Sequence, residues 1–158
     1  MDRRVVITGM GIYSCLGKTL DEVRDSLYTG KSGIIFDQER KDMGFRSALT
    51  SKLEIPDLKK ELSRQQRQFM PEQAKYAYCA TVDALRQAGL DQDFLDKNDV
   101  GLIYGNDSSA VPVVESVEKI KAKKDTTLCG SEAIFQSMNS TVTMNLGCIF
   151  KLKGINLT

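Results

Sequence analysis

Arg4-Val5-Val6-Ile7-Thr8-Gly9-Met10-Gly11 is the stretch that decides the fold class of this chain. Its β-branched run ends at a glycine, which is typical of a buried strand followed by a loop. Downstream, Thr19-Leu20-Asp21-Glu22 predicts a capping box, with Thr19 as the N-cap and Glu22 reaching back, and Gly30 ends that helix. The side chains expected on its inner face are Leu20, Val23 and Leu27.

The same alternation of strand and helix continues along the chain. Val100-Gly101-Leu102-Ile103-Tyr104 predicts a second buried strand, and a third begins at Ile155. Residues 31–58 look irregular, and 58–70 are polar with helical propensity. Further helices are expected at 71–89, where Pro71 starts and Gly89 ends the pattern, at 113–122, and within 131–150. This alternation predicts an α/β fold with at least partly parallel strands, in one domain spanning 1–158.

Composition excludes several classes of function. The 158 residues carry 22 basic and 21 acidic side chains, so there is no overall bias toward nucleic acid or anionic membranes. No histidine is present, which removes Ser-His and Cys-His nucleophile pairs, a histidine general base and histidine metal ligands. No stretch predicts a signal peptide or a membrane-spanning helix.

The cysteines are widely spaced, with no C-x-x-C pair, which argues against a zinc site and against a redox dithiol. They are Cys15, Cys79, Cys129 and Cys148. In a chain of this size we expect reduced, mostly buried thiols of a cytoplasmic protein.

The turn at Gly9-Met10-Gly11 has two interpretations. A dinucleotide-binding loop needs a tight turn, access to pyrophosphate and a helix N-terminus behind it. Here Ser14 stands where the third glycine of G-x-G-x-x-G belongs, and no acidic residue closes a second strand about 20 residues on. A structural glycine turn is the favoured alternative.

Three further groups of residues each have a functional and a structural interpretation. Asn106-Asp107-Ser108-Ser109 follows the second strand, where open α/β sheets bind ligands, yet short polar side chains also bond their own backbone. Two basic patches, one with Arg64 and Arg67 and one over residues 119–124, are either solvated helix faces or docking sites for an acidic protein. The apolar side chains Phe135, Met138 and Met144 either line a tunnel or pack in the core.

Taken together and in order, several segments resemble the amino-terminal part of a β-ketoacyl-acyl-carrier-protein synthase. The matching segments are Arg4 to Gly11, Gly30-Lys31-Ser32-Gly33-Ile34, Leu62-Ser63-Arg64, Phe69-Met70, Val100 to Gly105, and Phe150 to Leu157. The resemblance implies a thiolase-like fold, of which this chain covers most of the first of two similar halves.

The resemblance also implies a chemistry. An acyl group passes from carrier protein to a cysteine thiolate at a helix N-terminus. Malonyl-carrier protein then loses CO₂, and its carbanion attacks the thioester, with two histidines binding the thioester carbonyl and a lysine in support. Backbone N–H groups serve as the oxyanion hole. The family's cysteine follows soon after the strand that begins at Ile155, so none of these catalytic groups is expected within this chain. Cys148 lies in a helical context that does not match the nucleophile.

Binding residues carry over at a few positions. Ser108 matches the family's gate position after the second strand, and Phe135 lies near its acyl-pocket lining. Residues 135–146 resemble the segment that contributes to the dimer contact. The basic positions that match carrier-protein docking residues are Arg64, Arg67, Lys123 and Lys124. The family often has a glycine-rich run where this chain has Asn106 to Ala110, which leaves acyl-length preference and pathway open.

The resemblance therefore implies part of a cytoplasmic condensing enzyme for fatty-acid or polyketide chain extension. It implies acyl carrier protein as partner, a homodimer of the full-length enzyme, no metal, no cofactor, no nucleic acid and no membrane insertion. The 158 residues by themselves are expected to be inactive. Two alternatives stay open: a non-catalytic partner subunit of a synthase heterodimer, resembling a chain-length factor, and, more distantly, a nucleotide-binding α/β domain. The residue at the nucleophile position separates the first of these from an active enzyme.

Overall fold

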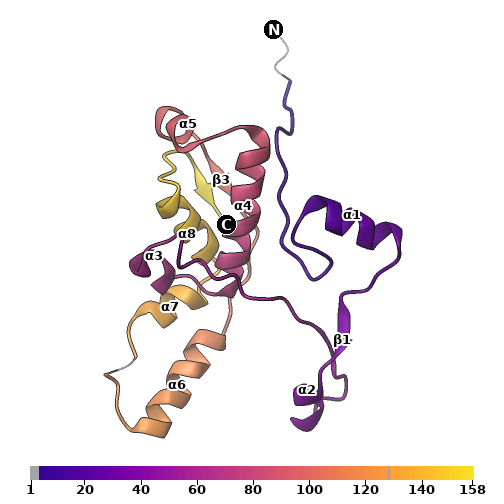
Figure 1. The fold of residues 1–158 in the computed structure, drawn as a ribbon. Coiled ribbons are helices and arrows are strands. Elements are labelled where there is room, and N and C mark those ends of the chain that lie inside the picture. The colour runs from indigo at the N-terminus through magenta and orange to yellow at the C-terminus, as the bar shows by residue number, and fades with distance from the viewer. Residues whose placement is uncertain (1–3, 128) are drawn as a thin grey trace. The chain divides into compact units, whose positions relative to one another are not determined.

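A computed structural model describes residues 4–127 and 129–158 of the chain. Within these residues the helices are α1 (Leu20–Tyr28), α2 (Gln38–Asp42), α3 (Arg64–Gln68), α4 (Glu72–Ala88), α5 (Gln92–Lys97), α6 (Val111–Lys123), α7 (Glu132–Ser137) and α8 (Thr141–Ile149). The strands are β1 (Ile34–Phe36), β2 (Leu49–Ser51), β3 (Leu102–Ile103) and β4 (Asn156–Leu157). They form two compact units (Figure 1). Unit 1 contains residues 4–55 and Cys79–Ala88, and unit 2 contains Pro56–Tyr78 and Gly89–Thr158.

In unit 1 the amino-terminal segment is extended but does not form the predicted strand. Val5, Val6 and Ile7 are 97%, 72% and 84% exposed, so the expectation of a buried strand at residues 4–8 is wrong for this structure. The physical reason is that a strand is defined by a hydrogen-bonded neighbour, and no strand of the described residues pairs with this segment. Its sequence pattern is that of a strand, but no strand of residues 4–127 and 129–158 lies beside it to complete a ladder.

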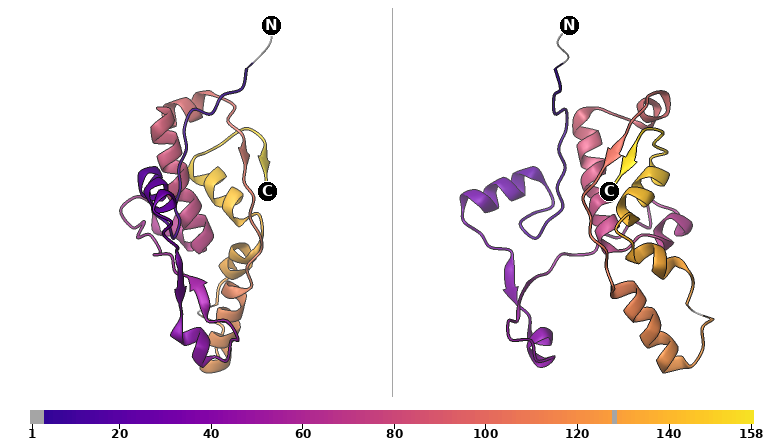
Figure 2. Two further views of the ribbon diagram at one scale, coloured as in Figure 1. Left: turned by 90° about the vertical axis from the view of Figure 1, so that its right-hand side faces the viewer. Right: turned by 180° about the vertical axis from the view of Figure 1, so that it is seen from behind.

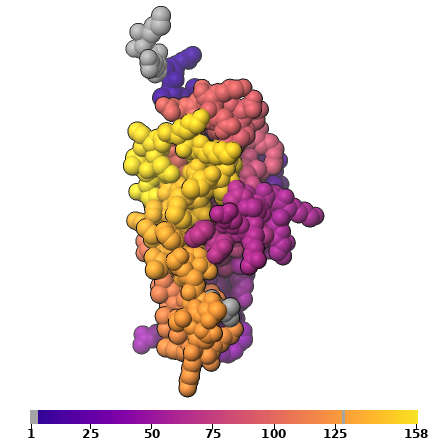
Figure 3. Space-filling view, turned by 90° about the vertical axis from the view of Figure 1, so that its left-hand side faces the viewer, coloured from indigo at the N-terminus to yellow at the C-terminus, as the bar shows by residue number. Residues whose placement is uncertain are grey.

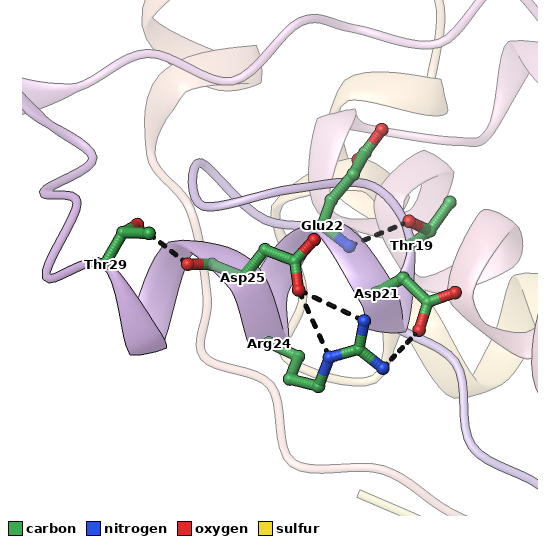
Figure 4. A network of polar contacts seen from close by, with 6 residues as sticks. All are labelled: Thr19, Asp21, Glu22, Arg24, Asp25 and Thr29. Carbon is green, nitrogen blue, oxygen red and sulfur yellow. Dashed lines mark hydrogen bonds and ion pairs between the residues drawn. The ribbon is translucent and has the colours of Figure 1, made fainter.

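Helix α1 begins at the predicted cap. The Thr19 hydroxyl accepts a hydrogen bond from the Glu22 N–H at 3.2 Å, whereas the Glu22 carboxylate accepts from the Lys18 N–H and not from Thr19. Figure 4 shows this cap beside the Arg24 guanidinium, which bridges Asp21 at 2.8 Å and Asp25 at 3.1 Å. Of the expected inner face, Leu27 is exposed, and the buried position on this helix is the neighbouring Ser26.

Residues 31–58, expected to be irregular, contain a β-hairpin with a helix in its connection. Strand β1 pairs antiparallel with β2, with Ile34 opposite Ser51 and Phe36 opposite Leu49. Between them Asp37 caps α2, accepting hydrogen bonds from the Glu39 and Arg40 N–H groups at 3.0 and 3.4 Å. Each strand is only three residues long, and an alternation of apolar and polar residues over three positions is too short to predict a strand from the sequence.

Unit 2 contains the parallel strand pair that the alternation of elements predicts. Strand β3 pairs with β4 in parallel, with Leu102 opposite Asn156 and Ile103 opposite Leu157. Helix α8 packs beside both strands, as Figure 2 shows from two sides. The fully buried side chains include Leu95, Val142 and Leu146, and the Tyr78 ring stacks on Phe150 with their centroids 5.7 Å apart.

The remaining predicted helices are present with adjusted bounds. Helix α4 follows Pro71 and ends before Gly89, whose φ of 68° suits glycine. Helix α6 starts two residues earlier than expected, at Val111, and the region 131–150 divides into α7 and α8. Only the short α3 forms within the polar stretch 58–70, where Ser63 and Gln66 make a complete capping box.

Candidate functional site

The glycine turn at residues 9–11 serves close packing against α4. A Cβ atom built on Gly9 would lie 2.2 Å from the Ala84 carbonyl oxygen, and one on Gly11 would lie 1.8 Å from the Ala80 carbonyl oxygen. Neither position therefore accepts a side chain without displacing backbone. The Met10 N–H in the same turn donates to Gln87 Oε1 at 2.6 Å. This geometry supports the structural interpretation of the turn over the dinucleotide-binding one.

The polar loop after β3 is held to the segment around α7. The Asn106 amide donates to the Asn139 carbonyl at 2.8 Å, and the Ser109 N–H donates to the Ser137 carbonyl at 3.1 Å. The Asp107 carboxylate accepts from the Ser108 N–H at 2.7 Å, so part of this loop bonds its own backbone. Ser108 itself is exposed, and its hydroxyl lies 3.5 Å from the Asp107 carboxylate.

Tyr104 stands at the end of β3, immediately before this loop. Burial raises the pKa of its phenol above the ordinary value of 10. The Tyr104 phenol is protonated at neutral pH, as an ordinary tyrosine is. Its backbone N–H donates to the Leu157 carbonyl at 3.1 Å, which ties the loop's origin to β4.

Phe135 contributes to an apolar pocket of about 380 Å³ in unit 2. Its ring packs edge-on against Phe69, with the centroids 5.8 Å apart. The other lining residues are Gln65, Gln66, Met144, Asn145, Cys148 and Ile149. Phe135 and Met144 thus share one pocket, whereas Met138 and Ser108 are not among its lining residues.

The four basic residues expected to dock a carrier protein lie on two separate elements. Arg64 and Arg67 belong to α3, and the Arg67 side chain is partly committed, since its Nε donates to the Leu62 carbonyl at 3.1 Å. Figure 3 shows the segment that includes α3, in purple, standing out beside the orange and yellow residues of α7 and α8. Lys123 ends α6, and Lys124 caps it in the left-handed conformation with φ of 50°. Within the described residues, the two arginines of α3 and the two lysines at the end of α6 share no hydrogen-bonding or ion-pair partner.

The thiols depart from expectation in their burial. Cys15 and Cys148 are exposed and only Cys79 and Cys129 are partly buried, so the prediction of mostly buried thiols is wrong. Cys148 is accessible because it lines the open pocket that also contains Phe69. Within residues 4–127 and 129–158 no group of Cys, Asp or Glu side chains is arranged to hold a metal ion.

Sequence reasoning missed a buried polar set on α8. Thr141, Thr143 and Asn145 are all buried, and the Asn145 amide donates to the Phe69 carbonyl at 3.0 Å and to the Thr141 carbonyl at 2.7 Å. Asn145 therefore fixes α8 against the residue that follows α3. The sequence does show polar residues spaced through an otherwise apolar helix. That spacing alone does not indicate what these side chains bond.

The comparisons with known proteins cover nearly the whole chain. Residues 2–158 match the family model described as "Beta-ketoacyl synthase, N-terminal domain". A 3-oxoacyl-[acyl-carrier-protein] synthase 1 of Buchnera aphidicola from Acyrthosiphon pisum is 33% identical over 97% of the chain. The chain spans 38% of that relative's length.

Two solved structures share the fold of this chain. A β-ketoacyl synthase from Burkholderia phymatum superposes with a TM-score of 0.83 at 25% identity, covering 99% of this chain and 39% of that one. A type II polyketide ketosynthase in complex with its acyl-carrier protein superposes with a TM-score of 0.69 at 22% identity, covering 97% of this chain and 41% of that one. Among the described residues no helix has both the length and the apolar character needed to cross a membrane.

Proposed function

This chain belongs to the β-ketoacyl synthase family, and from that premise we propose that it forms the amino-terminal part of a 3-oxoacyl-[acyl-carrier-protein] synthase. The observation that carries the proposal is the match of residues 2–158 to the family's N-terminal domain. The superposition on a solved β-ketoacyl synthase over 99% of the chain supports it. The fold is that of the amino-terminal part of the thiolase-like ketosynthases.

The proposed reaction joins two acyl units through a cysteine thioester. A cysteine thiolate takes the acyl group from its carrier thioester and releases the carrier thiol. Malonyl-carrier protein then loses CO₂, its carbanion attacks the enzyme thioester, and the cysteine thiolate leaves as 3-oxoacyl-carrier protein forms. The family resemblance assigns two histidines to this reaction. The chain holds no histidine, so we propose that both lie outside these 158 residues. The 158 residues alone are accordingly proposed to be inactive.

The chain's own contribution to this reaction is proposed to be substrate binding. The pocket that contains Phe135 is apolar and of a size that suits part of an acyl chain. The loop with Ser108 follows β3 at the end of the strand where open sheets bind ligands. The exposed α3 helix offers Arg64 to an acidic partner, with Arg67 on the same helix, and Lys123 and Lys124 add positive charge at the end of α6.

The proposed partner is acyl carrier protein, and the proposed assembly is a homodimer of the full-length enzyme in the cytoplasm. One of the superposed ketosynthases was solved in complex with its acyl-carrier protein, which supports the choice of partner. The Ser-, Thr- and Met-rich stretch from Phe135 to Leu146 is the segment proposed to contribute to the dimer contact.

The test is to express the complete reading frame that contains these residues and to assay it with acyl- and malonyl-carrier protein. We expect release of CO₂ and formation of 3-oxoacyl-carrier protein, and neither product from the 158 residues alone. The residue that the frame encodes at the nucleophile position after β4 is read in the same experiment. A different residue there, together with no condensation, would replace the enzyme by the non-catalytic partner subunit.

A further inference from the structure

Helix α8 and strand β4 are joined by side-chain hydrogen bonds in addition to their packing. The Asn156 amide donates to the Thr143 carbonyl oxygen at 3.1 Å. The hydroxyl oxygens of Thr143 and Thr158 lie 2.5 Å apart. Asn156 and Thr158 are two residues apart on an extended segment, so their side chains lie on the same face. Both of them reach the same residue, Thr143, on α8.

The direction of the contact between the two hydroxyls follows from counting protons. Thr143 Oγ1 lies 3.0 Å from the Ser140 carbonyl oxygen and donates its one proton to it. The Thr158 hydroxyl must then donate to Thr143 Oγ1. This arrangement forms a short chain of partly buried hydrogen bonds from the end of β4 to the first turn of α8.

The helix side of this contact is buried and shaped to receive Asn156. Thr143 is 3% exposed, and Asn145 on the same helix is 5% exposed and bonded to the Phe69 carbonyl. One turn beyond Thr143, a Cβ atom built on Gly147 would lie 2.7 Å from the Asn156 amide nitrogen. A glycine at that position therefore makes room for the amide.

Strand β4 needs such an anchor because its ladder is short. It is two residues long, and the described bonds from β3 are Leu102 N–H to the Ile155 carbonyl at 2.7 Å and Tyr104 N–H to the Leu157 carbonyl at 3.1 Å. The backbone bonds to β3 lie along one edge of β4 and leave its other side free to move about that edge. The bonds to Thr143 lie on the α8 side and remove that freedom.

We propose that Thr143 and Asn156 are positioning residues, which clamp β4 to α8 and so set the direction in which the chain leaves β4. The inference rests on the proposed function, in which the nucleophilic cysteine follows β4. Misplacing a reacting group by about 1 Å can cost roughly 100-fold in rate. The clamp therefore acts on the chemical step through the placement of the nucleophile, with no contact to substrate.

The test compares Thr143→Val, Thr143→Ser and Thr29→Val in the protein expressed from its complete reading frame. Valine keeps the shape of threonine and removes both hydrogen bonds of the hydroxyl, whereas serine keeps them. Thr29 is the matched control because its hydroxyl also bonds a helix carbonyl, that of Asp25 at 2.7 Å, on α1 in unit 1 (Figure 4).

Two quantities are measured on each variant. Hydrogen exchange of the peptide spanning residues 152–158 reports on the clamp without any catalytic activity. The kcat and KM for condensation report on positioning. For Thr143→Val we expect exchange about 10-fold faster and kcat roughly 10- to 100-fold lower, with KM changed by less than about 2-fold. Thr143→Ser and Thr29→Val should behave as the wild type does.

The possible failures are separable. Unchanged exchange in Thr143→Val means that the Thr143 hydroxyl does not hold β4 to α8, which overturns the proposed role of Thr143, because this variant keeps the bond from Asn156 to the backbone carbonyl of residue 143. Faster exchange with an unchanged kcat, or with a loss confined to KM, overturns the positioning role. A wild-type protein that exchanges as expected but condenses nothing refutes the proposed function, and with it the catalytic half of the inference, while the exchange data still decide whether the clamp exists.

Discussion

At the scale of single residues, Gly11 illustrates how a position without a side chain is specified by its neighbour. The space that its Cβ would need is filled by the Ala80 carbonyl group of α4, at 1.8 Å. The obstruction is backbone, which cannot rotate away as a side chain can. The requirement for glycine here therefore comes from the close approach of α4 and not from a ligand.

Gly11→Ala should destabilise the fold by about 1–3 kcal/mol, because the turn or α4 must move to admit the methyl group. Chemical unfolding at low protein concentration, followed by circular dichroism, measures the change. The control is Gly105→Ala, since nothing lies within 4 Å of a Cβ at that position. Its effect should stay within about 0.5 kcal/mol. Equal stabilities for the two variants would show that the close approach does not exist.

Asp37 is the second residue whose role is defined by its surroundings. Burial opposes its ionisation, but the N–H groups of Arg40 and Glu39 and the Lys52 ammonium outweigh it, so that the pKa of Asp37 is lowered. The Lys52 Nζ lies 3.4 Å from its carboxylate. A folded-state pKa below the unfolded value of about 3.9 gives stability that is present above that value and lost as pH falls through the folded pKa.

We therefore expect Asp37→Asn to flatten the acid limb of the stability curve. Asparagine keeps the capping oxygen but carries no charge, so the midpoint of thermal unfolding should fall less between about pH 5 and pH 2 than it does in the wild type. Asp99→Asn removes an exposed carboxylate and serves as the control. If the curves of Asp37→Asn and the wild type run parallel through this range, the cap contributes no pH dependence.

At the scale of elements, α3 is a short helix that carries two arginines and is stabilised by a complete capping box. Its Ser63 hydroxyl accepts from the Gln66 N–H at 3.2 Å, and the Gln66 side chain accepts from the Ser63 N–H at 2.9 Å. Arg67 is anchored to the Leu62 carbonyl, whereas among the described contacts Arg64 has no ion pair. Arg64 is therefore the arginine of α3 that is free to meet a partner.

Arg64→Glu should weaken turnover of carrier-protein substrates by roughly 10-fold in kcat/KM in the protein expressed from its complete reading frame, because it reverses a charge that is proposed to steer an acidic partner. Turnover of small thioester surrogates should be unchanged, since these have no docking surface. Arg46→Glu makes the same change of charge at another exposed arginine and should affect neither substrate. An equal loss on both kinds of substrate would remove the docking role of Arg64.

At the scale of the whole molecule, each unit leaves apolar side chains in contact with water. In unit 1 these include Val5, Ile7 and Phe36, and in unit 2 they include Ile103, Val114 and Ile134. The sheet of β3 and β4 has only two strands, so within the described residues each of these strands has one unpaired edge. Unpaired edges and apolar patches of this kind favour association with other chains.

The 158 residues by themselves should consequently associate in solution. Light scattering coupled to size exclusion should give a mass that rises with concentration above the 17.6 kDa of the monomer. Self-association should weaken when Val5 and Ile7 are replaced together by threonine, which keeps the β-branched shape and lowers the apolar area. A monodisperse monomer with a sharp, cooperative melt would contradict this expectation.

The sequence by itself determined the features that depend on neighbours along the chain. Thr19 begins α1 because its hydroxyl bonds an N–H three residues on, and Gly89 ends α4 because its φ is positive. The alternation of strand and helix gave the α/β class and the parallel pairing, and the ordered matches along the chain gave the family.

Only the tertiary structure decided the features that depend on residues far apart in sequence. It left residues 4–8 unpaired, because a strand pattern forms a ladder only beside a partner. It also brought Asn145 to Phe69 and opened Cys148 to a pocket. Packing of α8 against β4 likewise placed Asn156 within hydrogen-bond distance of the Thr143 carbonyl. Such contacts join elements whose separation along the chain carries no periodic signal, so they exist only once the elements have packed.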